Sequence, residues 1–136
     1  MKRRLTRRIL WISLSLAALS PLAHAASIPG EASVVRALDK VTARIQDLII
    51  PIGETVTYGT LEITSRKCLK RPPEEAPETA TFLEIREIKQ DEEALQVFSG
   101  WMFASSPALN ALEHPVYDVW VIDCKMSEGG VSKGKE

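Results

Sequence analysis

The clearest structural signal in the chain is the stretch YDVWVIDC at residues 117–124. β-Branched and aromatic residues fill most of it, and such residues favour strands. Successive side chains of a strand point to opposite faces of a sheet. The stretch therefore predicts a strand with one face that carries Asp118, Trp120, Ile122 and Cys124. The opposite face then carries Tyr117, Val119, Val121 and Asp123.

Similar short segments precede this strand and are separated by turn residues. Apolar residues alternate with polar ones at residues 55–58 and 61–68, and extended segments are also predicted at residues 81–88 and 94–102. Alternation with a period of two means that one face of each strand is buried and the other is exposed to solvent. The pattern thus predicts a sheet protein with a core on one side of each strand.

The first segment of the domain fits two structures. Residues 41–50 are rich in β-branched side chains and end at Pro51, which favours a strand. Apolar residues from Val34 to Leu48 also follow helical spacing, and a helical turn over residues 34–40 is the alternative. Prolines and glutamates dominate residues 70–79, which predicts an exposed loop outside the sheet.

One short helix is predicted at residues 105–112. Serine can cap its start, Pro107 occupies its first turn, and His114-Pro115 ends it. About six short strands with one short helix are typical of a compact antiparallel sandwich or barrel. The predicted fold class is therefore mostly β.

The first 25 residues have the layout of a secretory signal peptide. Five basic residues precede an apolar run at residues 9–19, which is followed by Ala23-His24-Ala25. We expect cleavage after Ala25. The apolar run is shorter than the about 20 residues that cross a bilayer, so no transmembrane span is expected after cleavage. The remainder is divided into a flexible lead-in at 26–33, a single β-rich domain at 34–125 and a disordered tail at 126–136.

The charge of the expected mature chain argues against two classes of partner. Without the five basic residues of the signal, 12 basic and 18 acidic residues remain, which gives a net charge of −6. Nucleic-acid binding depends on Lys and Arg that neutralise phosphates, and anionic lipid attracts basic segments. We therefore expect neither nucleic acid nor a membrane surface as partner.

Cys68 and Cys124 both lie in the expected mature chain. An oxidising compartment would join them as a structural disulfide, which is worth roughly 4 kcal/mol for a loop of this length. A thiol–disulfide redox pair is the alternative, although such pairs more often have the spacing C-x-x-C.

A catalytic interpretation takes Ser105 or Ser106 as nucleophile, His114 as base and Asp118 as the group that orients it. The chain lacks the G-x-S-x-G elbow of many serine hydrolases, and the serines can serve as a helix cap. A single mature histidine with scattered carboxylates does not make a zinc site, and no calcium loop or phosphate-binding loop is present. We therefore predict no catalytic residue, metal or cofactor.

Aromatic residues gather between residues 98 and 120. Their first interpretation is core packing. Tryptophan and tyrosine are also common anchors of binding surfaces. A possible binding surface is therefore predicted at Trp101, Phe103, His114, Tyr117, Asp118 and Trp120.

Several strings in the chain are also found together in a known family. They are VRALDKVTAR at residues 35–44, GTLEI at 59–63 leading to Cys68, KRPPEE at 70–75, FSGWMFASSP at 98–107 and HPVYDVW at 114–120. Over roughly residues 34–125 the chain resembles the domain-of-unknown-function family twenty-one fifty-five, which consists of small exported proteins of alphaproteobacteria. The resemblance implies a bacterial source and hence the periplasm, and it implies no activity.

The leading hypothesis is a non-catalytic binding or scaffold protein of the bacterial cell envelope. Its expected partner is an envelope protein or a cell-wall component. A small periplasmic hydrolase that uses Ser105 or Ser106 with His114 is the first alternative, and a redox partner that uses the two cysteines is the second.

Overall fold

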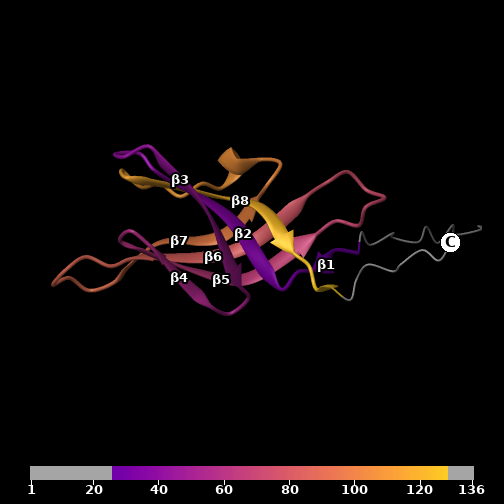
Figure 1. The fold of residues 1–136 in the computed structure, drawn as a ribbon, viewed down its shortest axis with the longest axis horizontal. Coiled ribbons are helices and arrows are strands. Elements are labelled where there is room, and N and C mark those ends of the chain that lie inside the picture. The colour runs from indigo at the N-terminus through magenta and orange to yellow at the C-terminus, as the bar shows by residue number, and fades with distance from the viewer. Residues whose placement is uncertain (1–25, 129–136) are drawn as a thin grey trace, which may run out of the picture.

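The computed structural model describes residues 26–128, which form two antiparallel β-sheets packed face to face (Figure 1). The predicted signal segment at residues 1–25 and most of the predicted tail, residues 129–136, lie outside the described residues. The elements are β1 (Ile28–Pro29), β2 (Ala32–Asp39), β3 (Arg44–Pro51), β4 (Thr55–Tyr58), β5 (Leu61–Lys70), β6 (Thr79–Glu87), β7 (Leu95–Phe103), the 3-10 helix η1 (Pro107–Leu109) and β8 (Tyr117–Lys125). Within residues 26–128, no helix is long and apolar enough to cross a bilayer.

The strands divide unequally between the two sheets. The five-stranded sheet has the order β1-β5-β6-β7, and β4 also pairs with β5. The three-stranded sheet has the order β3-β2-β8. Figure 1 shows the strands of the three-stranded sheet crossing those of the larger sheet at an angle. The predicted mostly β fold, an antiparallel sandwich, is thus confirmed.

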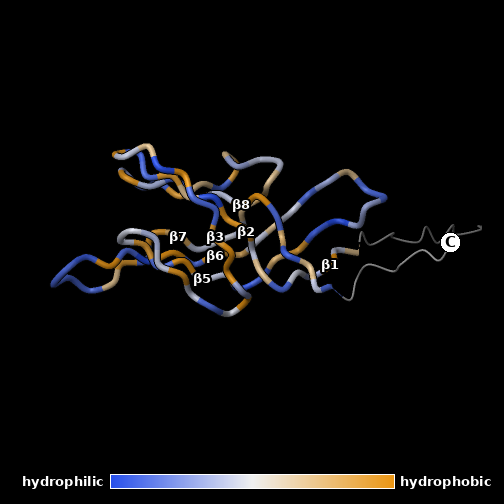
Figure 2. The backbone as a smooth tube through the Cα atoms, in the orientation of Figure 1, coloured by the Kyte–Doolittle hydropathy of each residue, from blue (hydrophilic) through white to orange (hydrophobic). Residues whose placement is uncertain are grey.

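The core lies between the two sheets and follows the alternation of the strands. Leu61 and Ile63 of β5 and Leu83 and Ile85 of β6 are fully buried. Opposite them lie buried residues of the three-stranded sheet, namely Val35, Ala37, Leu48, Ile50, Val119 and Val121. Figure 2 shows hydrophobic segments in both layers, with hydrophilic residues concentrated in the loops. Removing these apolar side chains from water is the main force that holds the sheets together.

At one end of the sandwich, which we name the closed end, the sheets are joined covalently. Cys68 at the end of β5 and Cys124 at the end of β8 form the predicted disulfide, with their Cα atoms 5.8 Å apart. Stacked sheets usually lie about 10 Å apart, so the sheets converge here. Gly30 permits this approach, because a Cβ at this position would lie 2.8 Å from the Cβ of Cys124.

Small buried hydroxyl residues fill the space next to the disulfide. The Oγ of Ser33 in β2 lies 2.7 Å from the Oγ of Ser65 in β5 and 2.5 Å from the Oγ1 of Thr81 in β6. Thr81 also donates to the carbonyl oxygen of Lys67 over 2.6 Å. Each buried hydroxyl therefore has a partner, which avoids the cost of leaving a polar group unsatisfied.

A β-bulge interrupts the alternation of β8. Val35 pairs with Val121, but the preceding residue, Val34, pairs with Asp123. Ile122 is thus an extra residue with no partner on β2. An inserted residue of this kind reverses which face the following side chains occupy.

The bulge corrects the predicted faces of β8. Cys124 joins Val121 on the buried face, and not Trp120 on the outer face as predicted. Asp123 in turn lies on the outer face with Asp118. The prediction was wrong because a strict period of two cannot reveal an inserted residue.

The helix predicted at residues 105–112 is a single 3-10 turn, Pro107–Leu109. The residue before it, Ser106, makes no side-chain capping hydrogen bond. The hydroxyl of Ser105 bonds instead to the carboxylate of Glu78. Without a serine cap, a segment this short does not form a stable α-helix from its own propensity.

The N-terminal part of the domain is more regular than predicted. Residues 34–40 belong mainly to β2 and not to a helical turn, and the strand predicted at 41–50 begins at Arg44, after a turn. Burial against the other sheet outweighs the helical spacing. Part of the predicted lead-in is also ordered, because Ile28–Pro29 pairs with β5 and β2 begins at Ala32.

Candidate functional site

The structure divides the six residues of the predicted binding surface among three places. Trp101 and Phe103 lie on the outer face of the five-stranded sheet, where the ring of Trp101 meets Phe82 edge to face at 5.6 Å. Trp120 and Asp118 lie on the outer face of the three-stranded sheet. His114 and Tyr117 stack at the end opposite the disulfide, with ring centroids 5.2 Å apart.

His114 is fixed by hydrogen bonds on both ring nitrogens. Its Nδ1 accepts from the backbone N–H groups of Val116 and Tyr117, each over 3.1 Å. Its Nε2 therefore carries the proton and donates to Oε1 of Glu87 over 3.0 Å. This hydrogen bond lowers the pKa of Glu87 and outweighs the partial burial, which acts to raise it. The histidine thus joins the loop before β8 to the end of β6.

The residues of the hydrolase hypothesis are not brought together. Ser105 bonds to Glu78, and among the hydrogen bonds of residues 26–128 none joins Ser105 or Ser106 to His114. Burial alone would raise the pKa of Glu78, but hydrogen bonds from Ser105 and Thr79 outweigh it and lower the pKa. Ser105 therefore has a carboxylate beside it, but no base oriented as in a catalytic triad.

Neither redox chemistry nor metal binding gains support from the described residues. Cys68 and Cys124 are 1% and 3% exposed, so the disulfide is shielded from an attacking thiolate. Within residues 26–128, no three side chains of the metal-ligating types lie close enough together to hold an ion.

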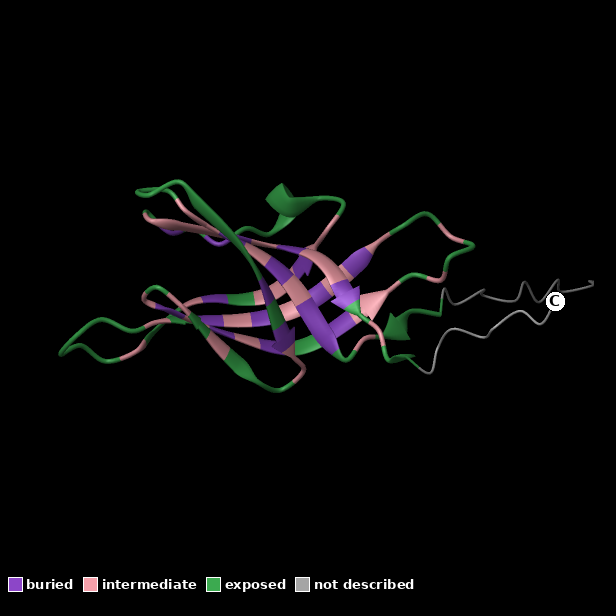
Figure 3. Cartoon of the chain, in the orientation of Figure 1, coloured by how far each residue is buried: buried purple, intermediate pink, exposed green. Residues whose placement is uncertain are grey.

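The outer face of the three-stranded sheet is an apolar surface that the fold leaves partly uncovered. Cross-strand partners share a face, so the register defines this outer face. Its apolar members are Val34, Leu38, Ile45, Ile49, Trp120 and Ile122. Ile45 and Ile49 are 62% and 56% exposed. Figure 3 shows the first half of β3 as exposed, in contrast to the buried bands of β2 and β8.

All four charged residues on this outer face have an ion partner. Arg36 of β2 forms a two-bond pair with Asp47 of β3, at 2.6 and 2.8 Å. The hydrogen bond from Arg36 is the main cause that lowers the pKa of Asp47, and the positive charge of Arg36 acts in the same direction. The Nζ of Lys40 lies 3.1 Å from Oδ1 of Asp118, and the Nζ of Lys70 lies 2.7 Å from Oδ1 of Asp123. The outer face is therefore close to electrically neutral.

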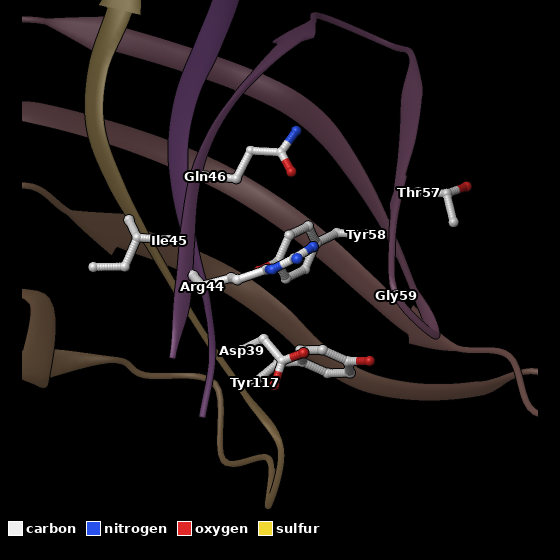
Figure 4. A pocket seen from close by; sticks show the side chains of 8 residues that line it. All are labelled: Asp39, Arg44, Ile45, Gln46, Thr57, Tyr58, Gly59 and Tyr117. Carbon is white, nitrogen blue, oxygen red and sulfur yellow. The ribbon is translucent and has the colours of Figure 1, made fainter. Parts of the chain in front are cut away.

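The end opposite the disulfide, which we name the open end, contains a cleft between the sheets. It has a volume of about 470 Å³. Figure 4 shows Arg44 and Tyr58 pointing toward one another from β3 and β4, with Asp39 and Tyr117 beside them. Tyr58 and Tyr117 meet edge to face at 5.6 Å and separate the two sheets.

Electrostatics in the cleft involve Tyr58 and Asp39. Burial raises the pKa of Tyr58, and the negative charge of Asp39 acts in the same direction. The backbone N–H of Thr42 lowers the pKa of Asp39. Asp39 Oδ1 accepts from the N–H groups of Val41 and Thr42 over 2.9 and 3.1 Å, so this carboxylate already stabilises its own turn.

Residues 33–124 match the model of a family described as "Uncharacterized protein conserved in bacteria (DUF2155)". The chain belongs to this family. The part of the chain that matches DUF2155 starts at Ser33 and ends at Cys124. It includes both cysteines and the whole outer face of the three-stranded sheet. The family resemblance predicted from the sequence is thus confirmed.

One bacterial relative shows the same similarity. "Uncharacterized protein RP359" of Rickettsia prowazekii (strain Madrid E) is 34% identical over 88 residues, which are 65% of this chain and 57% of the relative. The matched part of the chain spans little more than half of that relative's length. No solved structure matches this DUF2155 chain.

Sequence reasoning missed most of the outer face of this DUF2155 protein. It selected aromatic residues, whereas the exposed apolar residues of this face are Ile45 and Ile49 of β3, beside the half-buried Val34 and Leu38 of β2. A signal was present in β3, because apolar residues occupy both of its faces at residues 48–50. A strand at the edge of a sandwich usually has one polar face, so this pattern indicates a second surface to be covered.

Proposed function

We propose that the protein is an exported, non-catalytic binding or scaffold protein of the bacterial cell envelope, and that it holds a partner protein on the outer face of its three-stranded sheet. The observation that carries the proposal is the outer face itself. Six apolar residues lie there, and every charge among them is paired. Surfaces of this kind mark protein interfaces more often than binding sites for polar cell-wall glycans.

Two features support export. The basic, apolar and A-x-A regions before Ala26 have the layout of a cleavable signal. The disulfide between Cys68 and Cys124 suits an oxidising compartment, where such bonds persist. The natural protein, purified from a periplasmic extract, should therefore have the mass of a chain that begins at Ala26 and contains no free thiol. A mass that includes residues 1–25 would contradict the proposed location.

Photocrosslinking in living cells tests the binding face. A photoreactive amino acid at Ile49 lies on the outer face of the three-stranded sheet, and one at Glu84 lies on the outer face of the five-stranded sheet. We expect a discrete crosslinked protein from position 49 and none from position 84, because Ile49 is an exposed aliphatic residue, whereas Glu84 is a charged residue that pairs with Arg66. The substitution Trp120→Lys, on the same face, should abolish the crosslink from position 49.

The same experiment separates the possible partners. Enzymatic digestion of the cell wall should leave the apparent mass of the crosslinked product unchanged if the partner is a protein. It should lower that mass if the partner is a cell-wall polymer. No crosslink from position 49, or equal crosslinking from positions 49 and 84, would overturn the proposed function.

A further inference from the structure

The strand β3 has one edge without a partner. It is the last strand of the order β3-β2-β8, and among residues 26–128 its only strand partner is β2. Residues 44–47 and Ile49 are exposed. An edge strand presents unpaired backbone donors and acceptors, to which another strand can bind.

The hydrogen bonds around β2 show which backbone groups of β3 are free. The N–H of Lys40 donates to Val116, on the β8 side of β2, so the even-numbered residues of β2 face β8. The backbone groups of the odd-numbered residues of β2 then point toward β3, where their cross-strand partners have even numbers. The N–H of Ile52 donates to the carbonyl oxygen of Glu31, which fits this pattern. Successive residues of a strand point their backbone groups to opposite sides. The free N–H and C=O groups of β3 are therefore those of Ile45, Asp47 and Ile49.

Apart from the inward-pointing charge of Arg44, this edge lacks the usual features that prevent strand addition. Proteins protect edges with proline, lysine, bulges or unpaired charges. Residues 44–50 include no proline and no lysine, and the pairing of β3 with β2 has no register shift. The charge of Asp47 is neutralised by Arg36 on the same face. The backbone groups of Ile45, Asp47 and Ile49, which all point away from β2, are thus available to an added strand.

The cleft at the open end lies directly inside this edge. Arg44 and Gln46 of β3 line it from one sheet, and Thr57 and Tyr58 of β4 line it from the other. Among residues 26–128, the guanidinium of Arg44 makes no ion pair within 4.0 Å and no hydrogen bond. The nearby carboxylate of Asp39 is engaged by the N–H groups of its own turn. The cleft therefore holds a guanidinium without an ion pair, which can pair with an incoming carboxylate, and the carboxylate of Asp39 also lines this cleft.

We propose, on the basis of the proposed binding function, that β3 takes up an extended segment of the partner protein as an additional strand. The backbone of the segment bonds to Ile45, Asp47 and Ile49. Its side chains on one face are apolar and continue the outer face beside Ile45 and Ile49. On the other face an acidic side chain enters the cleft and pairs with Arg44. This mode of recognition derives affinity from the backbone and specificity from alternate side chains.

Charge favours a foreign segment over a second copy of this chain. The positions of β3 that point inward are Arg44, Gln46, Leu48 and Ile50, and none of them is acidic. A second copy that pairs through β3 would bring another arginine and no carboxylate to the cleft. Pairing centred on Asp47 would also place two aspartates opposite each other, which is destabilising.

A synthetic peptide tests the chemistry of the segment. The probe is a blocked heptapeptide with valine at alternate positions, threonine between them and one central glutamate; the control has lysine in place of glutamate. In the ¹⁵N-labelled protein, we expect the probe to slow hydrogen exchange of the amides of Ile45, Asp47 and Ile49. The lysine control should bind about three-fold more weakly, and Arg44→Glu should reverse this preference. Absence of binding, or an effect confined to other strands, would overturn the proposal.

Proline at a free edge position tests the backbone contact. In Asp47→Pro the lost N–H has no partner within the protein, whereas Asp47→Ala loses the same carboxylate and keeps the N–H. We expect Asp47→Pro to weaken probe binding at least about five-fold relative to Asp47→Ala, from the loss of one hydrogen bond. If Asp47→Pro fails to fold, Ile45→Pro against Ile45→Ala makes the same comparison. Equal binding by proline and alanine variants would falsify strand addition.

The outcomes separate this inference from the proposed function. A crosslink from position 49 that persists in Asp47→Pro would retain the outer face as a binding surface and exclude the added strand. The protein without peptide could also dimerise in a sedimentation experiment, with slower hydrogen exchange at the same three amides. That result would show that a second copy pairs with β3 and would overturn the proposal of a foreign segment.

Discussion

The two ends of the sandwich are built by opposite means. At the closed end, small residues and a disulfide draw the sheets together, with the Cα atoms of Cys68 and Cys124 only 5.8 Å apart. At the open end, Tyr58 and Tyr117 separate the sheets and leave a cleft of about 470 Å³. The size of the side chains between the sheets thus determines where the two sheets converge and where they leave a cleft between them.

The comparison indicates a division of roles along the strands. The closed end is dry, covalently linked and satisfied in its hydrogen bonds, so it contributes stability. The open end carries polar groups around Arg44 and the free edge of β3, and it is the end to which we assign the proposed recognition of a partner. Substitutions at the closed end should therefore change stability and leave binding unaffected, and those at the open edge should do the reverse.

The largest effect is expected from the closed end. The double variant Cys68→Ala, Cys124→Ala should lower the free energy of unfolding by about 4 kcal/mol, because the disulfide closes a loop with a sequence separation of 56. Urea denaturation followed by tryptophan fluorescence measures this loss. Reduction of the wild-type protein under denaturing conditions should give the same midpoint as the double variant. A loss below about 1 kcal/mol would mean that the closed end is held by packing alone.

The next largest effect is expected at the open end, where Gly59 lies against the ring of Tyr117. Gly59 has a φ of 58°, and a Cβ there would collide with the phenol group of Tyr117. Gly59→Ala should therefore destabilise the protein by about 3 kcal/mol, from the strained backbone and the displaced tyrosine. Gly53→Ala is the matched control, because its φ is 86° but a Cβ would meet nothing within 4 Å. The control should cost about 1 kcal/mol in thermal or urea unfolding, and equal costs would disprove a wedge role of Tyr117.

A smaller effect is expected from the hydroxyl cluster beside the disulfide. Thr81→Val keeps the shape of the side chain but removes its hydrogen bonds to Ser33 and Lys67. We expect a loss of about 2 kcal/mol, since buried partners are left unsatisfied. Thr64→Val is the control, because the hydroxyl of Thr64 bonds to that of Thr55 at an exposed position. Its cost should stay within about 0.5 kcal/mol in the same urea titration.

The last prediction concerns pH at the open end. The hydrogen bond from His114 lowers the pKa of Glu87 in the folded protein below its ordinary value of 4.5. A depressed carboxyl pKa stabilises the fold above the unfolded pKa, and this contribution disappears as the pH falls through the folded pKa. The urea midpoint should therefore decline below about pH 4.5, and Glu87→Gln should flatten this decline. An identical acid profile in both proteins would show that the pair contributes nothing to stability.

Much of this architecture could be predicted from local patterns. Alternation identified β5, β6 and β8, and the argument from the compartment identified the pairing of Cys68 with Cys124. These features depend on residues close in sequence or on the only two cysteines present. The bulge at Ile122 could not be predicted, because it is defined by the register of β8 against β2, a strand more than 80 residues earlier.

The candidate site was harder to predict for a similar reason. Aromatic residues that are close in sequence, such as Trp101, Tyr117 and Trp120, lie on three different surfaces once the chain crosses between sheets. Ile45 is apolar, and its exposure follows from its place on the outer face of the three-stranded sheet, which the larger sheet does not cover. Which side of a strand lacks a neighbour is a property of the assembled sheets.

The way in which the described chain enters and leaves the sandwich gives the molecule a direction. Ile28 of β1 pairs beside Cys68, and the carbonyl oxygen of Lys125, at the end of β8, accepts from Glu31, so both ends of the described chain meet at the disulfide. A fluorescent protein or an affinity tag fused at either terminus would sit at the far pole from Arg44. Such a fusion, or a surface to which the protein is immobilised by one terminus, would leave the recognition tip pointing outward and accessible.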